Sequence, residues 1–391
     1  MMKIGVFLIL SMVVGSSIAH LFLEDKGYVF IHFLSYSVEM SVPFFFILLL
    51  ISYCLLRILF NFISIPKKMM LSLDISKNKK SKKNLNLGVK NIYEGNWAKG
   101  ENLISSSLQS EDKSLIKYML LAKAANSQGL IDRRDEWFRL AYINLPSAIS
   151  AISLTKAELQ FANKDYEGAL ATLEKFRNNN INHPLALGLL AKTYNSLGDW
   201  DSLIKLMPDI SNAQMDKEER VIIVNRALKK FGDRKNIKLE SLDRVFNSLA
   251  SSIKSDPKII STYSLLLARL GNSIRAEKNI SQAMKKNWNN DLIYSYGLIR
   301  TVSIDKQLRK SELWLAKKPD NALILLTCAR FCIYLELWGK AKKYLELSLD
   351  IDGNAEAYKI YGRMLKEMGD IEGSAIAYDK GLKTYLKNKT L

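Results

Sequence analysis

Two apolar stretches near the start of the chain constrain its fold more than any other feature. They cover residues 4–23 and residues 42–65, and the second is interrupted only by Arg57 and Asn61. A helix of about 20 apolar residues crosses a hydrocarbon core of roughly 30 Å, so each stretch is long enough to span a membrane. The segment between them, residues 24–41, is too short to form a domain. The sequence therefore predicts a two-helix membrane hairpin over residues 1–65.

The charges that flank the apolar stretches predict the orientation of this hairpin. The loop at 24–41 carries three acidic residues against one lysine, whereas residues 66–90 carry eight lysines and one acidic residue. Lysine and arginine concentrate on the cytoplasmic side of membrane helices. We therefore expect both termini in the cytoplasm, the loop outside, and residues 66–90 as a flexible basic tether beside anionic lipid head groups.

An alternative interpretation of the first stretch is a cleaved signal peptide. Ser17-Ile18-Ala19 resembles a small-residue cleavage site that follows an apolar region. The uncleaved helix is favoured because the stretch stays apolar through Phe22 and Leu23. Both interpretations leave the loop outside and the large domain inside.

The loop between the two stretches is rich in aromatic and β-branched residues over positions 27–40. Their alternation is typical of a short extended or hairpin segment. Tyr28, Phe30 and Tyr36 would equally suit the membrane–water interface, where aromatic side chains gather.

From residue 91 to residue 391 the chain repeats with a period of about 34 residues. The repeated element is a break of glycine or polar residues followed by a large residue. It occurs as Gly95-Asn96-Trp97, Gly129-Leu130-Ile131, Lys164-Asp165-Tyr166, Gly198-Asp199-Trp200, Glu336-Leu337-Trp338 and Gly369-Asp370-Ile371, with a weaker copy at Gly271-Asn272-Ser273 and another break near 302–305.

The residues on both sides of each break have helical spacing. Leu187, Leu190, Ala191 and Tyr194 form one apolar helix face before the break at Trp200. The period and the small residues before each break resemble the tetratricopeptide repeat. Eight or nine such units fit between residues 91 and 382, and residues 220–255 match worst, which predicts an irregular helical pair there. The predicted fold class is all-α, a tetratricopeptide-like α-solenoid behind the membrane hairpin.

Stacked helix pairs of this kind form a concave surface that binds partners. First-helix residues that point away from the second helix would line it. They are mostly basic or polar, which favours an acidic protein segment or an anionic ligand, although the same residues would also suit a solvated helix face. The candidates are Glu158, Lys192, Asn195, Arg330, Lys359, Arg363 and Lys366.

Candidates for metal or cofactor chemistry are few. His20, near the first apolar stretch, and His32, in the loop, are possible haem ligands, whereas His183 precedes a proline at an expected helix start. Cys328 and Cys332 could share a ligand, but core filling is the favoured interpretation, and Cys54 lies in the second apolar stretch. We expect no metal site and no bound cofactor.

The sequence contains none of the short motifs that mark common enzyme classes. It has no His-Glu-x-x-His, no Gly-x-Ser-x-Gly and no glycine-rich phosphate or dinucleotide fingerprint. The net charge of +18 would suit nucleic acid, but much of the excess lies beside the membrane helices, and no nucleic-acid-binding motif accompanies it. The chain is therefore predicted to be neither an enzyme nor a nucleic-acid-binding protein.

The order of these features resembles the HemY family of bacterial inner-membrane proteins. The resemblance lies in the loop Gly27-Tyr28-Val29 with Tyr36-Ser37-Val38-Glu39-Met40-Ser41, in the basic segment, and in Asn182-His183-Pro184 followed by Trp200 and Pro208. It implies a scaffold or regulator linked to late porphyrin and haem synthesis, without catalytic residues. A flavin-dependent oxidase shares the family's name, but the missing dinucleotide fingerprint argues against that enzyme.

Three functions are therefore open. The first is an inner-membrane scaffold whose cytoplasmic repeats bind proteins, and the resemblance implies that these are enzymes of the haem pathway. The second is a porphyrin or haem carrier or sensor that uses His20, His32 or a groove in the repeats. The third is an adaptor for assembly of another envelope system, which the two membrane helices and the lack of a metal-binding tail disfavour.

Overall fold

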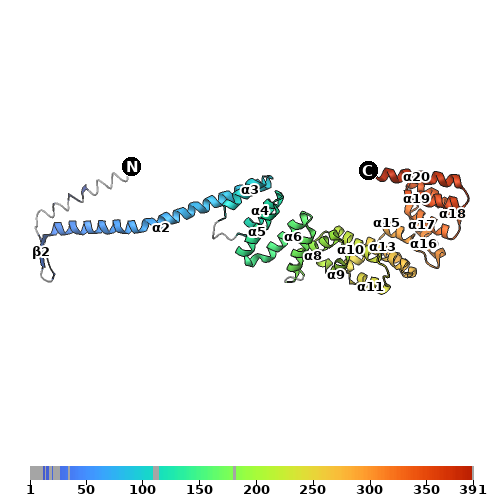
Figure 1. Ribbon diagram of the computed structural model, residues 1–391, viewed down its shortest axis with the longest axis horizontal. Helices are drawn as coiled ribbons and strands as arrows, with labels where there is room; N and C mark the ends of the chain where they lie inside the picture. Colours follow the sequence, from blue (N-terminus) through green and yellow to red (C-terminus); the bar gives the residue numbers. More distant parts are fainter. Residues whose placement is uncertain are drawn as a thin grey trace. The chain divides into compact units, whose positions relative to one another are not determined.

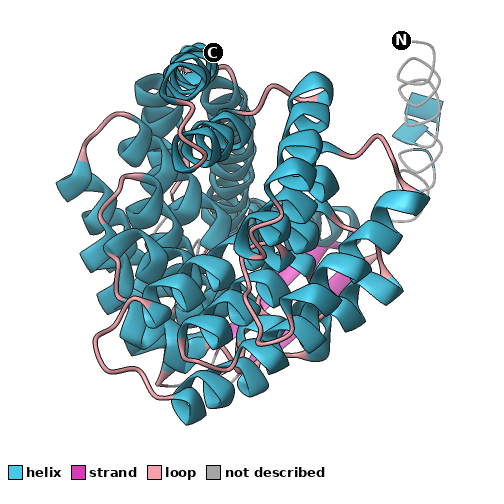
Figure 2. Cartoon of the chain, turned by 90° about the vertical axis from the view of Figure 1, so that its right-hand side faces the viewer, coloured by secondary structure: helices cyan, strands magenta, loops and turns pink. Residues whose placement is uncertain are grey.

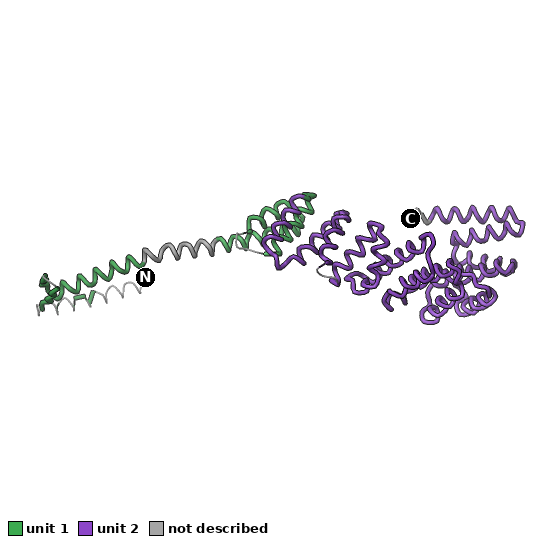
Figure 3. Tube along the Cα trace, turned by 60° about the horizontal axis from the view of Figure 1, so that its bottom comes forward, with its two compact units in different colours: residues 1–131 green, residues 132–391 purple. Residues whose placement is uncertain are grey.

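The computed structural model describes residues 12–13, 15–16, 20, 27–33, 36–108, 114–178 and 182–389, with the backbone alone at 61–76 and 388–389. These residues are almost entirely helical, with strands confined to one hairpin (Figure 2). The chain divides into two compact units, Met1–Ile131 and Asp132–Leu391 (Figure 3). The predicted first membrane helix, residues 4–23, lies almost wholly outside the described residues.

A short antiparallel hairpin precedes the first described long helix. Strand β1 (Tyr28–Phe33) pairs with β2 (Tyr36–Ser41), so that Tyr28 lies opposite Ser41 and Phe33 opposite Tyr36. The predicted extended loop is thus confirmed. Its aromatic side chains at 28, 30, 33 and 36 are exposed, and their location in a membrane interface stays a prediction.

Helix α2 (Val42–Tyr93) begins directly after the hairpin and continues without a break for 52 residues. Pro43 lies in its first turn, where the missing N–H costs no hydrogen bond. Its segment Val42–Phe60 is the one helix among the described residues that is long and apolar enough to cross a membrane. A two-helix membrane hairpin therefore remains a prediction.

The structure differs from the expected tether at residues 66–90, because that segment is helical and belongs to α2. Its second half packs against α3 (Trp97–Ser106). The Ser81 hydroxyl donates to the Ser107 carbonyl over 2.7 Å, and Ile92 is buried between the two helices. Lysine and leucine favour helices, and this packing keeps the segment ordered. The repeat region therefore begins about ten residues before residue 91.

Helix α4 (Leu115–Ser127) completes the described part of the first unit. It packs on α3, and its Lys117 ammonium donates to the Ser107 carbonyl over 3.0 Å. The Gln128 amide, just past the end of α4, donates to the Glu101 carboxylate of α3 over 2.7 Å. Two polar contacts thus fix α4 on the preceding pair.

The second unit consists of successive helices that alternate between a first and a second position (Figure 1). The first helices are α6 (Ile149–Ala162), α8 (Pro184–Leu197), α10 (Lys217–Gly232), α13 (Pro257–Arg269), α15 (Asn290–Tyr296), α17 (Ala322–Tyr334) and α19 (Ala355–Glu367). The second helices are α5 (Ile131–Asn144), α7 (Tyr166–Arg177), α9 (Trp200–Leu206), α11 (Leu239–Ser248), α14 (Ser273–Lys286), α16 (Ile304–Lys317), α18 (Trp338–Ile351) and α20 (Ile371–Lys389). Three short helices, η1 (Pro146–Ala148), η2 (Ile210–Asn212) and α12 (Ser251–Lys254), lie between them.

The connection inside most pairs is a single residue in the left-handed conformation. Such residues let the chain reverse after the last helical turn. They are Gly95, Gly129, Lys164, Gly198, Asn236, Gly271, Glu336 and Gly369, and all but Asn236 lie at a break predicted from the sequence. The predicted break near 302–305 also separates two helices, α15 and α16, without a left-handed residue. The helix-pair organisation is therefore confirmed.

Polar caps set where several first helices begin. The side chains of Asp256, Asn289, Asn321 and Asn354 accept hydrogen bonds from backbone N–H groups in the first turns of α13, α15, α17 and α19. These caps satisfy donors that have no partner inside the helix.

The core of the second unit consists of two buried clusters that adjoin near α10 to α13. One extends from Leu154 to Ile259, and the other from Phe231 to Ala377. Ile204, Val245 and Phe246 pack against both clusters. Each pair thus buries its apolar face on the next, as expected of stacked repeats.

Tyrosine–carboxylate bonds join second helices to the following first helices. The hydroxyls of Tyr194, Tyr263, Tyr296 and Tyr361 donate to carboxylates on the preceding second helix. The four acceptors are Glu174 at 3.4 Å, Asp243 at 2.6 Å, Glu277 at 3.1 Å and Glu346 at 2.8 Å. These acidic residues recur at multiples of about 34 positions, so the bond is part of the repeat.

Residues 220–255 form the irregular pair that the sequence predicts. Helix α11 stops at Ser248, and Leu249 and Ala250 have extended backbones before α12 begins at Ser251. The second position of this repeat is therefore occupied by two short helices instead of one long helix. This interruption lies beside a hollow in the second unit.

Candidate functional site

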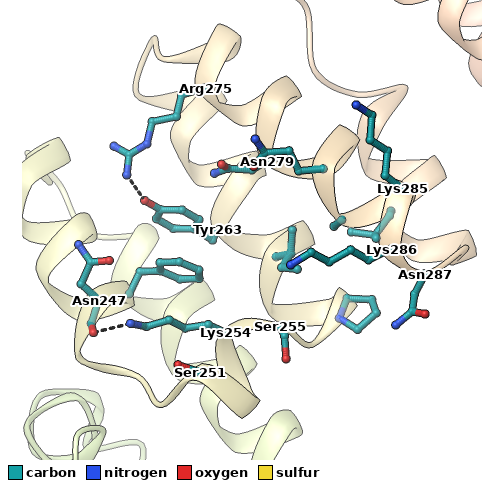
Figure 4. Close-up of a pocket in the computed structure, with 16 residues that line it drawn as sticks. Asn247, Ser251, Lys254, Ser255, Tyr263, Arg275, Asn279, Lys285, Lys286 and Asn287 are labelled. Carbon is teal, nitrogen blue, oxygen red and sulfur yellow. Dashed lines mark hydrogen bonds between the residues drawn. The ribbon is translucent and has the colours of Figure 1, made fainter.

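The hollow lies between α11 and α12 on one side and α14 on the other, with α13 between them (Figure 4). Its volume is about 760 Å³. Phe246, Pro257, Ile260 and Leu292 provide much of its apolar lining. A cavity of this size that combines apolar and polar lining is a candidate binding site.

Phe246, Tyr263 and Arg275 form one wall of the hollow, and bonds to Asp243 hold two of them in place. The rings of Phe246 and Tyr263 stack with centroids 3.7 Å apart. The Tyr263 hydroxyl donates to Asp243 over 2.6 Å, and the Arg275 guanidinium donates both to Asp243 over 2.6 Å and to the Tyr263 oxygen over 2.8 Å (Figure 4). These bonds hold Tyr263 and Arg275 in one orientation.

The electrostatics of this wall follow from its hydrogen bonds. Burial opposes ionisation of Asp243, but the hydrogen bonds from Arg275 and Tyr263 outweigh it, so the pKa of this carboxyl lies below its usual value. Burial, and then the bond to Asp243, raises the pKa of Tyr263. The hydrogen bond to Asp243 raises the pKa of Arg275. At neutral pH the wall therefore presents a neutral phenol and a guanidinium, both bonded to the ionised Asp243, which does not itself line the hollow.

The rest of the polar lining is basic or neutral. Lys254, Lys285 and Lys286 line the hollow, and none of them forms an ion pair with a carboxylate of the described residues. The Lys254 ammonium donates to the Asn247 carbonyl over 2.7 Å (Figure 4). Asn247, Asn279, Gln282 and Asn287 add side-chain amides. No acidic residue lines the hollow, so it is suited to a negatively charged ligand.

The candidates predicted from the sequence on α8 do not lie free at a surface. The Lys192 ammonium pairs with Glu219 of α10 over 2.8 Å. The Asn195 side-chain oxygen accepts a hydrogen bond from Arg226 of α10 over 3.1 Å. Both residues therefore connect one first helix to the next, and each still keeps part of its surface in solvent.

Arg330 is buried, and the expectation that it lines an open surface is wrong. Only 5% of its side chain is exposed. Its guanidinium on α17 pairs with Glu356 of α19 over 2.5 Å and lies 4.9 Å from the ring centre of Tyr294 on α15. The residue links three successive first helices, which explains why its charge is kept inside.

The other predicted partner-binding residues are exposed but dispersed. Glu158 lies on α6, and Lys359, Arg363 and Lys366 lie on α19. Arg363 pairs with Glu367 of its own helix over 3.1 Å. The structure does not bring Glu158 and the three basic residues into one described cavity, and their role in partner binding stays a prediction.

The histidines and cysteines are distributed over several elements. His20 is exposed, and His32 is an exposed residue of β1 opposite Ser37. His183 occupies the N-cap position of α8 without a side-chain capping bond, and its ring packs edge-on against Phe176. Cys328 and Cys332 are buried in α17, where burial raises the pKa of their thiols to about 12 and about 11. Among the described residues no three metal-ligating side chains come together.

Lys254, Lys285 and Lys286 were not predicted as site residues. A sequence signal was present, because Lys285 and Lys286 are adjacent at the end of α14 with no acidic residue among the four on either side. The signal that was missing is the interruption of the second helix at Leu249 and Ala250, which shows only in the backbone.

The fold and the apolar part of α2 define a class of protein, a helical-repeat protein with a membrane-type helix. The family model "HemY protein N-terminus" matches residues 27–129. Protein HemY of Escherichia coli strain K12 is 25% identical over 230 residues, which are 57% of this chain and 56% of that protein. Protein HemY of Shigella flexneri gives the same values. The chain is thus similar to HemY proteins over its N-terminal part, and this similarity together with the apolar helix indicates a membrane-associated protein.

The match spans only about half the length of these curated relatives. Similar solved structures include Naa15/Naa10 bound to HypK-THB, with a TM-score of 0.39 and 14% identity over 80% of this chain and 59% of that chain. They also include the human IFIT1 dimer with m7Gppp-AAAA, with a TM-score of 0.35 and 14% identity over 77% and 76% of the two chains. Because both scores are low, the assignment to helical repeats rests on the helix pairs described above.

Proposed function

We propose that this chain is a non-enzymatic scaffold or regulator of a bacterial inner membrane, which binds protein partners through its repeats in the cytoplasm. The observation that carries the proposal is the continuity of α2, which extends from the apolar span into the first helix pair. A protein held by the repeats would be confined near the bilayer. Confinement of this kind raises the effective concentration of two partners without any new contact between them.

The proposed partners are enzymes of late porphyrin and haem synthesis. This step rests on the similarity to the HemY family, whose N-terminal model matches over the hairpin, α2 and the first repeats. Late intermediates of that pathway are apolar, so a scaffold at the membrane surface would keep their enzymes close to where these intermediates partition. The proposal assigns no catalytic residue to this chain.

Affinity purification of the full chain from solubilised membranes tests the proposal. The expected result is co-purification of porphyrin-pathway enzymes, with loss of that recovery when residues 1–60 are replaced by a soluble tag. Such a loss would show that the membrane anchor contributes to assembly. Recovery of envelope proteins alone would contradict the haem link and would favour the envelope adaptor.

A direct role in carrying porphyrin is the competing function. It predicts a visible absorbance band in the purified chain that changes when His20 and His32 are replaced by alanine. A colourless preparation that still recovers the enzymes would support the scaffold and exclude the carrier.

A further inference from the structure

The hollow between α11–α12 and α14 carries a positive charge that the protein does not neutralise itself. Three of its four basic residues, Lys254, Lys285 and Lys286, lack a carboxylate partner among the described residues, whereas Arg275 is bound to Asp243. Elsewhere in the second unit many basic residues pair with carboxylates, as Lys192 and Lys310 do. Unpaired cations around one concave region attract an anionic ligand and orient it as it approaches.

The neutral polar groups of the hollow are of a kind that suits a polypeptide. Asn279, Gln282 and Asn287 each offer an amide N–H donor and a carbonyl acceptor, and none of the three makes a described side-chain hydrogen bond in the structure. A peptide main chain presents the complementary donors and acceptors at every residue. Side-chain amides can therefore bind an extended segment without regard to its sequence.

The apolar groups of the hollow provide a place for one side chain. Phe246, Ile260 and Leu292 line it, and the ring of Tyr263 is held in place against Phe246. Rigid aromatic groups lose little conformational freedom when a ligand binds. One apolar side chain placed there would anchor the segment, while flanking carboxylates reach the lysines.

We propose that the hollow binds a short acidic segment of a protein partner, with one apolar side chain against Phe246 and Tyr263 and with carboxylates paired to Lys254, Lys285 and Lys286. The inference rests on the proposed scaffold function and specifies how a partner is held. It places this contact beside second helices, not on the first-helix face where the sequence predicts partner binding.

Panning of a random 12-residue peptide library on the full chain in lipid nanodiscs tests the proposal. The wild-type chain is expected to enrich peptides that combine aspartate or glutamate with a leucine or an aromatic residue. The affinity of enriched peptides, measured by fluorescence anisotropy, should fall about tenfold or more in the double variant Lys285→Glu/Lys286→Glu, because repulsion replaces attraction at two positions. It should also fall as salt is added.

A matched control is available on α10. Lys229 and Lys230 are, like Lys285 and Lys286, adjacent exposed lysines in the last turn of a helix, but they do not line the hollow. The variant Lys229→Glu/Lys230→Glu therefore changes the net charge and the electrostatics of a helix end by the same amount as Lys285→Glu/Lys286→Glu does. Peptide affinity in this variant should stay within about twofold of wild type, as expected for charges outside the site.

Four outcomes would overturn the proposal. One is a wild-type chain that enriches no acidic peptides, and another is equal loss of affinity in the two double variants. The third is binding of laurate, a small anionic amphiphile, that Lys285→Glu/Lys286→Glu abolishes while acidic peptides are not bound, since the hollow would then be a small-molecule site. If the variant still recovers porphyrin-pathway enzymes from membranes as well as wild type does, the scaffold function stands and this contact is wrong.

Discussion

At the scale of single residues, two left-handed connections carry side chains that make them unfavourable. Lys164 has φ = 63° and Glu336 has φ = 57°, at positions where most of the other connections use glycine. A residue with a Cβ atom costs roughly 1–2 kcal/mol in this conformation. Glycine removes that cost but loses more backbone entropy on folding, about 0.5–1 kcal/mol.

The first prediction is that Lys164→Gly stabilises the chain by about 0.5 kcal/mol, because relief of the left-handed strain exceeds the entropy loss. The measurement is the urea midpoint of the full chain in detergent. Lys156→Gly, in the right-handed helix α6, is the matched control. It should lower the free energy of unfolding by about 1 kcal/mol and the urea midpoint with it. A lower midpoint for both variants would show that the side chain of Lys164 makes a contact that outweighs the strain.

Asp243 is the residue on which the wall of the hollow depends. Because its pKa in the folded chain is lowered, the stability that it contributes is complete above its unfolded pKa and is lost as pH falls through the folded pKa. It accepts hydrogen bonds from Tyr263, which is buried, and from Arg275, which is partly buried. Removing the charge leaves these two donors without an ionised acceptor.

The second prediction is that Asp243→Asn destabilises the chain by about 2 kcal/mol at pH 7, the usual size for a charged hydrogen bond. The difference from wild type should begin to shrink as pH falls below about 4, where the carboxyl of the unfolded chain binds a proton, and should vanish as pH falls through the lower folded pKa. Urea midpoints at both pH values measure this. Glu136→Gln, which breaks a fully exposed ion pair with Arg139, is the control and should change the midpoint little at either pH.

The positions of the helix breaks could be predicted from the sequence, because a glycine or a polar pair before a large residue marks a chain reversal locally. The burial of Arg330 could not be predicted. Its partners Tyr294 and Glu356 lie 36 positions before and 26 positions after it, so only the packing of α15, α17 and α19 determines that the guanidinium points inward. Helical spacing predicts the helix face on which a residue lies, but it does not predict which residues from other helices it contacts.

At the scale of elements, the packing of α2 on α3 depends on two glycines that face each other. A Cβ atom on Gly88 would lie 2.5 Å from the Ile104 side chain and 3.1 Å from the Gly100 carbonyl oxygen. A Cβ atom on Gly100 would lie 3.0 Å from the Gly88 carbonyl oxygen. Since a backbone oxygen on each side cannot move freely, the two helices must separate to accept either side chain.

The third prediction is that Gly88→Ala destabilises the α2–α3 pair by about 1–3 kcal/mol through overpacking. Hydrogen exchange of the α3 amides should become faster in this variant. Gly339→Ala in α18 is the matched control, because a Cβ atom there meets nothing within 4 Å. That variant should keep or increase stability, as alanine favours helices over glycine.

The error about the tether has its origin in the sequence of residues 66–90. Their many lysines and few acidic residues indicate a solvated segment, and solvated segments are often flexible. Lysine is nevertheless a good helix former, and contacts made by Ser81, Gly88 and Ile92 with the next helix stabilise the helix from its far end. Charge content alone therefore does not predict the conformation of such a segment.

At the scale of the whole molecule, the orientation across the membrane is the fourth prediction. A reporter enzyme that is active only in the periplasm, fused after Lys90, should be inactive, because the lysines before it favour the cytoplasm. A fusion within the 24–41 loop should be active. Activity at Lys90 would contradict the predicted orientation and remove the repeats from the compartment of their proposed partners.

Because helix α2 is unbroken, its length fixes both the distance of the first repeat from the bilayer and the direction in which that repeat faces. From Phe60, the end of the apolar span, to Ser81, the first contact with α3, are about 21 residues, or roughly 30 Å at 1.5 Å per residue. Each residue removed from this stretch lowers the first repeat toward the bilayer and turns it by about 100°. A deletion of seven residues would keep its facing almost unchanged, whereas a deletion of five would turn it by roughly 140°. Height and direction above the membrane can therefore be varied separately in one protein.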